Sequence, residues 1–157
     1  MKRHVYILFL LLSFAFSVSA QEKEARKIDE FGKLGCDDYL ARMDNAINEA
    51  SNNPTSTVYI LIYEGKEMKY NSRKRKDELV NPVSGSAKAK IDSIKKYVSL
   101  RKFPIKNFAF IESGFREESA IEIWIVPKGV LPPKPTPTLT NLKYRKGKAQ
   151  GFCTDCC

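Results

Sequence analysis

Residues 57–63 read TVYILIY, an unbroken run of β-branched, aliphatic and aromatic side chains. Side chains of these types favour strands, and a run that no charged residue interrupts is typical of a strand covered on both faces. We therefore expect residues 57–63 to form the central strand of a sheet, with the rest of the domain built around it.

Two amphipathic helices are expected, one before and one after this strand. Residues 37–50 place apolar side chains at helical spacing, at Leu40, Met43 and Ile47. Residues 86–100 repeat this pattern on a single face, at Ala87, Ile91, Ile94 and Val98. Each helix therefore has one apolar stripe, which suits a layer packed on one face of the sheet.

Three further segments read as strands. Residues 27–31 alternate apolar and charged side chains, and residues 107–112 and 119–126 are rich in aliphatic and aromatic residues. Gly114 marks a turn between the last two, and their short connection predicts an antiparallel hairpin. The order β-α-β-α-β-β predicts an α+β fold, a two-layer sandwich of two helices on a mixed sheet of about four strands. Trp124 is expected to cover the second face of the sheet against a helix, and a ligand-binding aromatic is the alternative.

A long hydrophilic segment follows the central strand. Residues 64–84 hold six Lys and Arg side chains. A loop of this length in a small domain is usually either functional or disordered. Two interpretations stay open: a solvated, flexible insertion and an anion-binding loop.

The N-terminus has the features of a secretory signal peptide. Lys2 and Arg3 precede an apolar run over residues 5–18, and small side chains before Ala20 predict cleavage after that residue. The run is shorter than the roughly 20 residues of a membrane-spanning helix, which favours cleavage over an uncleaved membrane anchor. We expect an exported protein of the periplasm or cell envelope, with residues 21–25 as a flexible N-terminus and no transmembrane segment after cleavage.

The chain is basic, and its mature part lacks histidine. Residues 21–157 hold 25 of the 27 Lys and Arg residues and all 18 Asp and Glu residues, a formal net charge of +7. This charge favours anionic partners such as lipids and cell-wall polymers, while export argues against nucleic acid. His4, within the signal, is the only histidine. Catalysis by a histidine base and metal sites that need histidine are therefore excluded for the mature chain.

Residues 26–127 form the expected domain, and residues 128–157 form a Pro-rich, basic, cysteine-ended tail. Four prolines within residues 132–137 predict a stiff, extended spacer. The four cysteines of the chain are Cys36, Cys153, Cys156 and Cys157. An even number of cysteines in an exported chain predicts disulfides.

Several cysteine pairings stay open at the level of sequence. We favour a bond from Cys36 to one of the tail cysteines, and a local Cys153–Cys156 bond is the nearest alternative. Intermolecular bonds or free thiols, a metal site of four thiolates, and a redox-active Cys-x-x-Cys motif are the remaining interpretations.

Four short segments carry a family resemblance. They are residues 89–98 (AKIDSIKKYV), 103–107 (FPIKN), 113–115 (SGF) and 120–123 (AIEI). Together with the strand order, they resemble the second helix, the start of the next strand, the following turn and the closing strand of the OmpA C-terminal domain family. These domains are peptidoglycan-binding modules of outer-membrane and flagellar-motor proteins. The resemblance covers roughly residues 26–127 and implies this fold and peptidoglycan binding.

The resemblance also implies a ligand site. Domains of this family hold a diaminopimelate side chain with an Asp after the central strand and an Arg on the second helix. Lys90 stands at the position of the Arg, Glu64 is the acid nearest to that of the Asp, and Arg116 is a third candidate for ligand binding. Lysine keeps the charge of arginine but lacks its bidentate fork, and residues 118–120 (ESA) replace the family's Asn-Arg-Arg. The implied site is therefore degenerate, and a solvated helix lysine is the alternative for Lys90.

These observations predict an exported, non-catalytic module that binds peptidoglycan or another anionic component of the cell envelope. A ligand-dead scaffold that binds a protein partner through its Pro-rich, basic tail is the second hypothesis, and an enzyme is the third. Ser93-x-x-Lys96 has the spacing of a Ser-Lys nucleophile, but no accompanying motif supports it. We expect no enzyme activity, no cofactor, no metal site and no nucleic acid partner.

Overall fold

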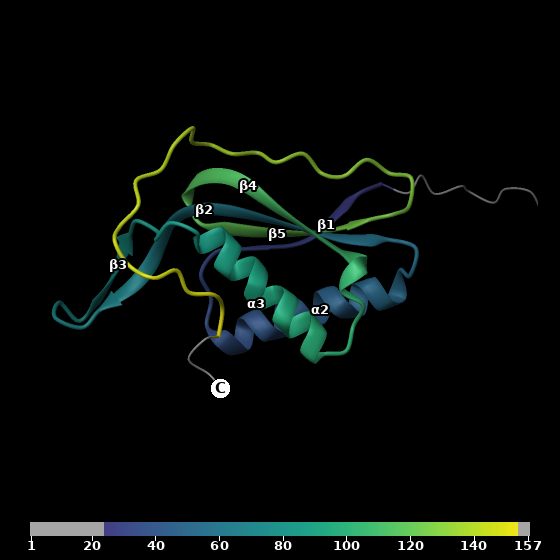
Figure 1. The fold of residues 1–157 in the computed structure, drawn as a ribbon, viewed down its shortest axis with the longest axis horizontal. Coiled ribbons are helices and arrows are strands. Elements are labelled where there is room, and N and C mark those ends of the chain that lie inside the picture. The colour runs from purple at the N-terminus through teal and green to yellow at the C-terminus, as the bar shows by residue number, and fades with distance from the viewer. Residues whose placement is uncertain (1–23, 154–157) are drawn as a thin grey trace, which may run out of the picture.

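The computed structural model describes residues 24–153, so the expected signal peptide, Cys156 and Cys157 lie outside the described residues. Within these residues the fold is the predicted α+β sandwich. One layer is a mixed sheet of five strands, and the other consists of helices α2 (Cys36–Asn52) and α3 (Ser86–Leu100). Figure 1 shows both helices on the same side of the sheet.

Strand β2 (Thr57–Asn71) lies in the middle of the sheet, as predicted for residues 57–63. β5 (Ala120–Val126) pairs antiparallel with β2 along one edge, and β4 (Phe108–Glu118) pairs parallel with it along the other. β1 (Arg26–Phe31) pairs antiparallel with β5 at the outer edge. The order across the body of the sheet is therefore β1-β5-β2-β4, and the short helix η2 (Ile105–Asn107) leads into β4.

β4 and β5 do not form the predicted hairpin, because β2 runs between them. The chain leaves β4 at Glu118 and crosses β2 at Gly65 before it enters β5. A Cβ atom at Gly65 would lie 2.3 Å from the carbonyl carbon of Glu118, so glycine alone leaves room for this crossing. Ser119 donates its backbone N–H to the carbonyl oxygen of Lys66 at 2.9 Å and fixes the crossing in place.

The turn predicted at Gly114 is a β-bulge within β4. Ile62 of β2 faces Glu112 and Glu64 faces Phe115, so β4 has one extra residue in this interval. Gly114 has a φ of 86°, a left-handed conformation that glycine adopts without steric penalty. A glycine in this conformation suits a bulge as well as a turn, which is why the sequence alone misplaced it.

The expectation of a long loop at residues 64–84 is wrong for most of this segment. β2 continues to Asn71, and β3 (Lys76–Val80) returns antiparallel to it, with Met68 opposite Leu79. Figure 1 shows this hairpin extending beyond the body of the sheet. The many charged residues of the segment conceal the alternation that marks these strands.

The hydrophobic core lies between the sheet and the two helices. Its buried side chains alternate along β2 and β5 and meet the apolar stripes of α2 and α3. The main contributors are Val58, Ile60, Ile62, Ile121, Ile123 and Ile125 from the sheet and Met43, Ala46, Ile94 and Val98 from the helices. The predicted stripes are thus the residues that join the two layers.

The second face of the sheet is covered by the tail, and no described helix lies on it. After β5 the chain turns back across this face (Figure 1), where the backbone N–H of Thr136 donates to the Tyr63 hydroxyl at 3.1 Å. Trp124 lies on this face and donates its indole N–H to Glu122 at 3.0 Å. The expectation that Trp124 packs against a helix is therefore wrong. The tail from residue 128 to residue 153 belongs to the folded unit and is not a free spacer.

Candidate functional site

Lys90 of α3 is largely buried, with 10% of its side chain exposed. It lies three residues after Ala87 and four before Ile94, so it shares the inward face of the helix. Its ammonium contacts the Glu67 carboxylate of β2 at 2.6 Å and lies 5.8 Å from the centre of the Phe152 ring. The alternative of a solvated helix lysine is therefore wrong.

A cleft of about 310 Å³ opens beside this ion pair, and we call it the Lys90 cleft. Its walls come from α3, the far half of β2, the loop before α2 and the end of the tail. Its charged side chains are Lys33, Lys69, Lys90, Arg145 and Glu67. The volume lies at the lower end of the range for small-molecule sites.

More cationic than anionic side chains line the Lys90 cleft. Four cations face one carboxylate, which leaves a formal excess of +3. Lys33 donates from Nζ to the carbonyl oxygen of Met68 at 2.5 Å, and Arg145 donates from Nε to that of Asn81 at 2.9 Å. Within residues 24–153, the acidic partner of the cleft, Glu67, pairs with Lys90 alone. Lys33, Lys69 and Arg145 thus have no carboxylate partner among residues 24–153.

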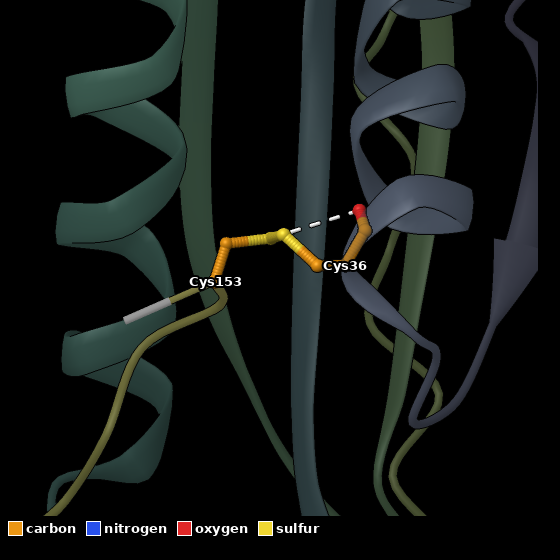
Figure 2. Close-up of a disulfide and its surroundings, with 2 residues drawn as sticks. All are labelled: Cys36 and Cys153. Atoms are coloured by element: carbon orange, nitrogen blue, oxygen red, sulfur yellow. Dashed lines mark hydrogen bonds between the residues drawn. A yellow bond between two sulfur atoms is a disulfide. The ribbon is translucent and has the colours of Figure 1, made fainter. Parts of the chain in front are cut away.

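A disulfide fixes the wall that the tail contributes (Figure 2). Cys153 is bonded to Cys36, the first residue of α2, across 117 residues, and their Cα atoms lie 5.2 Å apart. The neighbouring Phe152 stacks on Tyr39 of α2 with ring centres 4.2 Å apart. Gly151 lies so close to α3 that a Cβ atom there would collide with it. The favoured pairing of Cys36 with a tail cysteine is confirmed, and the local alternative for Cys153 is wrong.

Glu64 lies next to the Lys90 cleft but serves as a cap for α3. One carboxylate oxygen accepts hydrogen bonds from the Ser86 hydroxyl and the Ala87 backbone N–H, both at 2.8 Å. The other accepts a hydrogen bond from the hydroxyl of Tyr144 in the tail at 2.5 Å. Both oxygens are thus occupied by the protein, so the expectation that Glu64 binds ligand directly gains no support from its position.

The surroundings of Glu64 shift its ionisation and that of its partner. Burial by itself would raise the pKa of the Glu64 carboxyl, but the hydrogen bonds from Tyr144, Ala87 and Ser86 and the charge of Lys90 hold this pKa below its ordinary value. The hydrogen bond to the Glu64 carboxylate, with burial, raises the pKa of the Tyr144 hydroxyl to about 12. Glu64 is therefore a carboxylate at neutral pH, held between the start of α3 and the tail.

Arg116 lies on the second face of the sheet and is not part of the Lys90 cleft. Its guanidinium stacks on the Tyr63 ring at 3.5 Å from the ring centre. It also donates to carboxylate oxygens of Glu122 at 2.7 Å and Glu30 at 2.9 Å, and to the Thr136 hydroxyl at 2.7 Å. Arg116, itself in β4, therefore ties the tail to β1, β2 and β5 as well. Of the three predicted site residues only Lys90 lines the cleft.

Most of the other residues that line the Lys90 cleft carry no distinctive sequence signal. Lys69 belongs to the basic segment at residues 64–84, and Arg145 belongs to the basic tail, so composition points to their charge but not to their position. Lys33 and Glu67 line the same cleft only because the fold brings the loop before α2 beside the far half of β2. A contact of this kind follows from tertiary structure and not from spacing along the chain.

Comparison with known proteins gives no match to a family model, a curated protein or a solved structure. Among residues 24–153, no group of three or more His, Cys, Asp or Glu side chains is placed to hold a metal ion. No helix within residues 24–153 has the length and apolar character needed to cross a membrane.

Proposed function

We propose that this chain is an exported, non-catalytic module that binds peptidoglycan through carboxylate-bearing groups in the Lys90 cleft. The observation that carries the proposal is the largely buried Lys90–Glu67 pair at 2.6 Å, in a cleft with three further cations. A paired ammonium and carboxylate can exchange their mutual contact for a ligand that carries both groups. The three other cations favour a ligand in which carboxylates are in excess.

Peptidoglycan stem peptides have this chemistry, because they present several carboxylates beside an ammonium. The resemblance to the OmpA C-terminal domain family assigns the ligand-binding cation of its second helix to Lys90, and that residue lines the cleft. A lysine without a planar fork accepts a wider range of carboxylate positions than an arginine does. Of the residues that the resemblance implies, Lys90 is the one that lines the cleft, and it supports the proposal.

Export is supported by the N-terminal signal features and by the disulfide. A bond between Cys36 and Cys153 persists in an oxidising compartment and is rare in the cytosol. The absence of histidine from residues 21–157 removes the commonest acid-base group of enzymes, and no phosphate-binding glycine loop occurs in the sequence. Binding is therefore favoured over catalysis.

The test is co-sedimentation of the purified chain from residue 21 on with insoluble, purified peptidoglycan. K90E and K69E should each reduce the bound fraction strongly, because each reverses a cation of the Lys90 cleft. K106E is the matched control: it makes the same charge change at an exposed position of η2, beside the start of β4 and at the other end of the sheet. Equal losses for all three variants would show that binding depends on net charge alone and would reject the cleft.

K90E leaves Glu67 beside a new carboxylate and so carries a risk of destabilisation. K69E carries less of this risk, since Lys69 is exposed on β2, although the new carboxylate would stand opposite Glu78 of β3. Thermal unfolding of each variant separates a lost site from a lost fold. A K69E variant that unfolds like the wild type and still binds peptidoglycan equally well would contradict the proposal.

A second candidate is a scaffold that binds a protein partner through the tail. The observation in its favour is the exposed segment at residues 131–135, in which 82% of Leu131 is accessible. Deletion of the tail is a poor test, because it would also remove Cys153 and one wall of the Lys90 cleft. L131S with K134E tests this candidate without that loss, and a partner retained by this variant would exclude the segment.

A further inference from the structure

The hairpin of β2 and β3 carries a surface that the core does not use. We call residues 67–80 the β2–β3 arm. Among the described strands β3 pairs with β2 alone, and Figure 1 shows the arm reaching beyond the body of the sheet. The base of the arm, with Glu67, Met68, Lys69 and Val80, also lines the Lys90 cleft. The exposed side chains further along the arm are open to contact with something other than the rest of this chain.

One face of the β2–β3 arm is mainly apolar. Met68 and Tyr70 are two residues apart in β2, and Leu79 stands opposite Met68 in β3, so the three side chains point to the same side. Their exposed fractions are 47% for Met68, 60% for Tyr70 and 46% for Leu79. Asp77, opposite Tyr70, is a charged residue on this same side. The alternate positions are polar except for Val80, and there the Asn71 side chain donates to Glu78 at 2.8 Å. The arm is thus amphipathic.

The tip of the β2–β3 arm is basic. Its four consecutive cations are Arg73, Lys74, Arg75 and Lys76, all exposed. The side-chain oxygen of Asn71 accepts the backbone N–H groups of Arg73 and Lys74 and holds the turn in shape. Glu78 serves as the carboxylate partner of Lys74 at 2.8 Å and also lies 3.9 Å from Lys76. One carboxylate shared by two lysines leaves the tip with excess positive charge.

We propose that the β2–β3 arm binds the surface of an anionic lipid bilayer. Met68, Tyr70 and Leu79 would enter the boundary between headgroups and acyl chains, where aromatic side chains with a polar end are favoured. The basic tip would lie against the lipid phosphates, whose negative surface potential attracts clustered Lys and Arg. An exposed apolar face next to a cationic tip matches both layers of such a surface.

The charge of the tip favours a bilayer over a second copy of the chain. Two arms packed against each other would add no net negative charge to the eight cations of their tips, whereas anionic headgroups neutralise them. A soluble phosphate would occupy the tip but leave the apolar face in water. The combination of both features therefore selects a lipid surface.

The test is sedimentation of the chain from residue 21 on with vesicles of phosphatidylglycerol mixed into phosphatidylcholine, and with vesicles of phosphatidylcholine alone. M68S/Y70S/L79S and R73E/R75E should each weaken binding to the anionic vesicles by more than about tenfold. L100S/L131S removes comparably exposed apolar side chains elsewhere, and K95E/K96E makes the same charge change on α3. Both controls should change binding by less than about twofold.

The outcomes of the vesicle experiment decide whether the β2–β3 arm binds a lipid surface. Equal binding to neutral and anionic vesicles, or equal losses in arm and control variants, overturns the proposal. A wild type that sediments as a dimer and becomes monomeric in M68S/Y70S/L79S, with vesicle binding unchanged, assigns the face to a second copy and also overturns it. K90E should bind vesicles like the wild type, so failure of the Lys90 cleft and failure of the arm are distinguishable.

Discussion

Cys153 is bonded to Cys36, so the tail is fixed to the first residue of α2. The two cysteines are 117 residues apart in the sequence, so the loop that the bond closes includes almost the whole folded unit. It also holds Phe152 against Tyr39 and so keeps one wall of the Lys90 cleft in position. The tail, which the sequence predicts to be a spacer, is therefore part of the Lys90 cleft.

Replacement of Cys36 by serine should lower the free energy of unfolding by about 2–4 kcal/mol, because the bond restricts a long loop in the unfolded chain. Urea unfolding of C36S and of the wild type, each with and without a reductant, measures this difference. Reductant should bring the wild type to the stability of C36S and leave C36S unchanged. Peptide mapping that joins Cys36 to Cys156 or Cys157 would contradict the assignment.

Gly65→Ala should destabilise the fold by more than about 3 kcal/mol, because the new Cβ atom would overlap the backbone where β4 crosses to β5. Chemical denaturation measures the loss. Gly35→Ala is the control, since its Cβ would meet nothing nearer than 3.9 Å and its φ of −64° is open to alanine. That variant should stay within about 1 kcal/mol of the wild type. Similar effects at both glycines would argue against the crossing.

Glu64 should make the fold sensitive to acid. The pKa of its carboxyl is lower in the folded chain than the ordinary value of 4.5. The ionised carboxylate therefore stabilises the fold above pH 4.5, and this stabilisation is lost as the pH falls through the folded pKa. The wild type should therefore lose more unfolding free energy than E64Q between about pH 6 and about pH 3. E117Q, at an exposed position of β4, should keep the wild-type dependence. Parallel pH profiles for the wild type and E64Q would refute this role.

Arg116→Lys should loosen the tail while the charge is kept. Lysine cannot stack on Tyr63 and reach Glu122, Glu30 and Thr136 at once, so we expect a loss of about 1–3 kcal/mol. Amide hydrogen exchange measures how firmly the tail is held at this place, because the backbone N–H groups of residues 138 and 139 donate to the Phe115 carbonyl oxygen. Their exchange should be faster in R116K and unchanged in R73K, which alters the exposed tip of the arm. Unchanged exchange in R116K would separate Arg116 from the tail.

The parts of the fold that follow from local patterns were predictable from the sequence. The stripe of Ile91, Ile94 and Val98 gave the bounds of α3 as Ser86–Leu100, since side-chain spacing along a helix is independent of the rest of the chain. The run TVYILIY identified the central strand, because a strand covered on both faces needs apolar side chains at every position.

The features that were missed depend on contacts between distant segments. Short connections usually join paired strands, and only the absence of a side chain at Gly65 allows the chain to cross β2 instead. Met68 and Leu79 belong to a hairpin whose charged neighbours outweigh them in any hydrophobic average. Glu67 became a partner of Lys90 because β2 continues past its apolar part, a length that composition does not reveal.

The most direct test of the central claim is calorimetric titration of the chain from residue 21 on with a soluble peptidoglycan stem peptide. The account predicts saturable binding to the wild type and to K106E, and binding weakened by more than about tenfold in K90E and K69E, because each reverses a charge next to the ligand carboxylates. No binding to the wild type, or equal affinity in K69E and K106E with both variants folded, would contradict the assignment of the Lys90 cleft as the binding site.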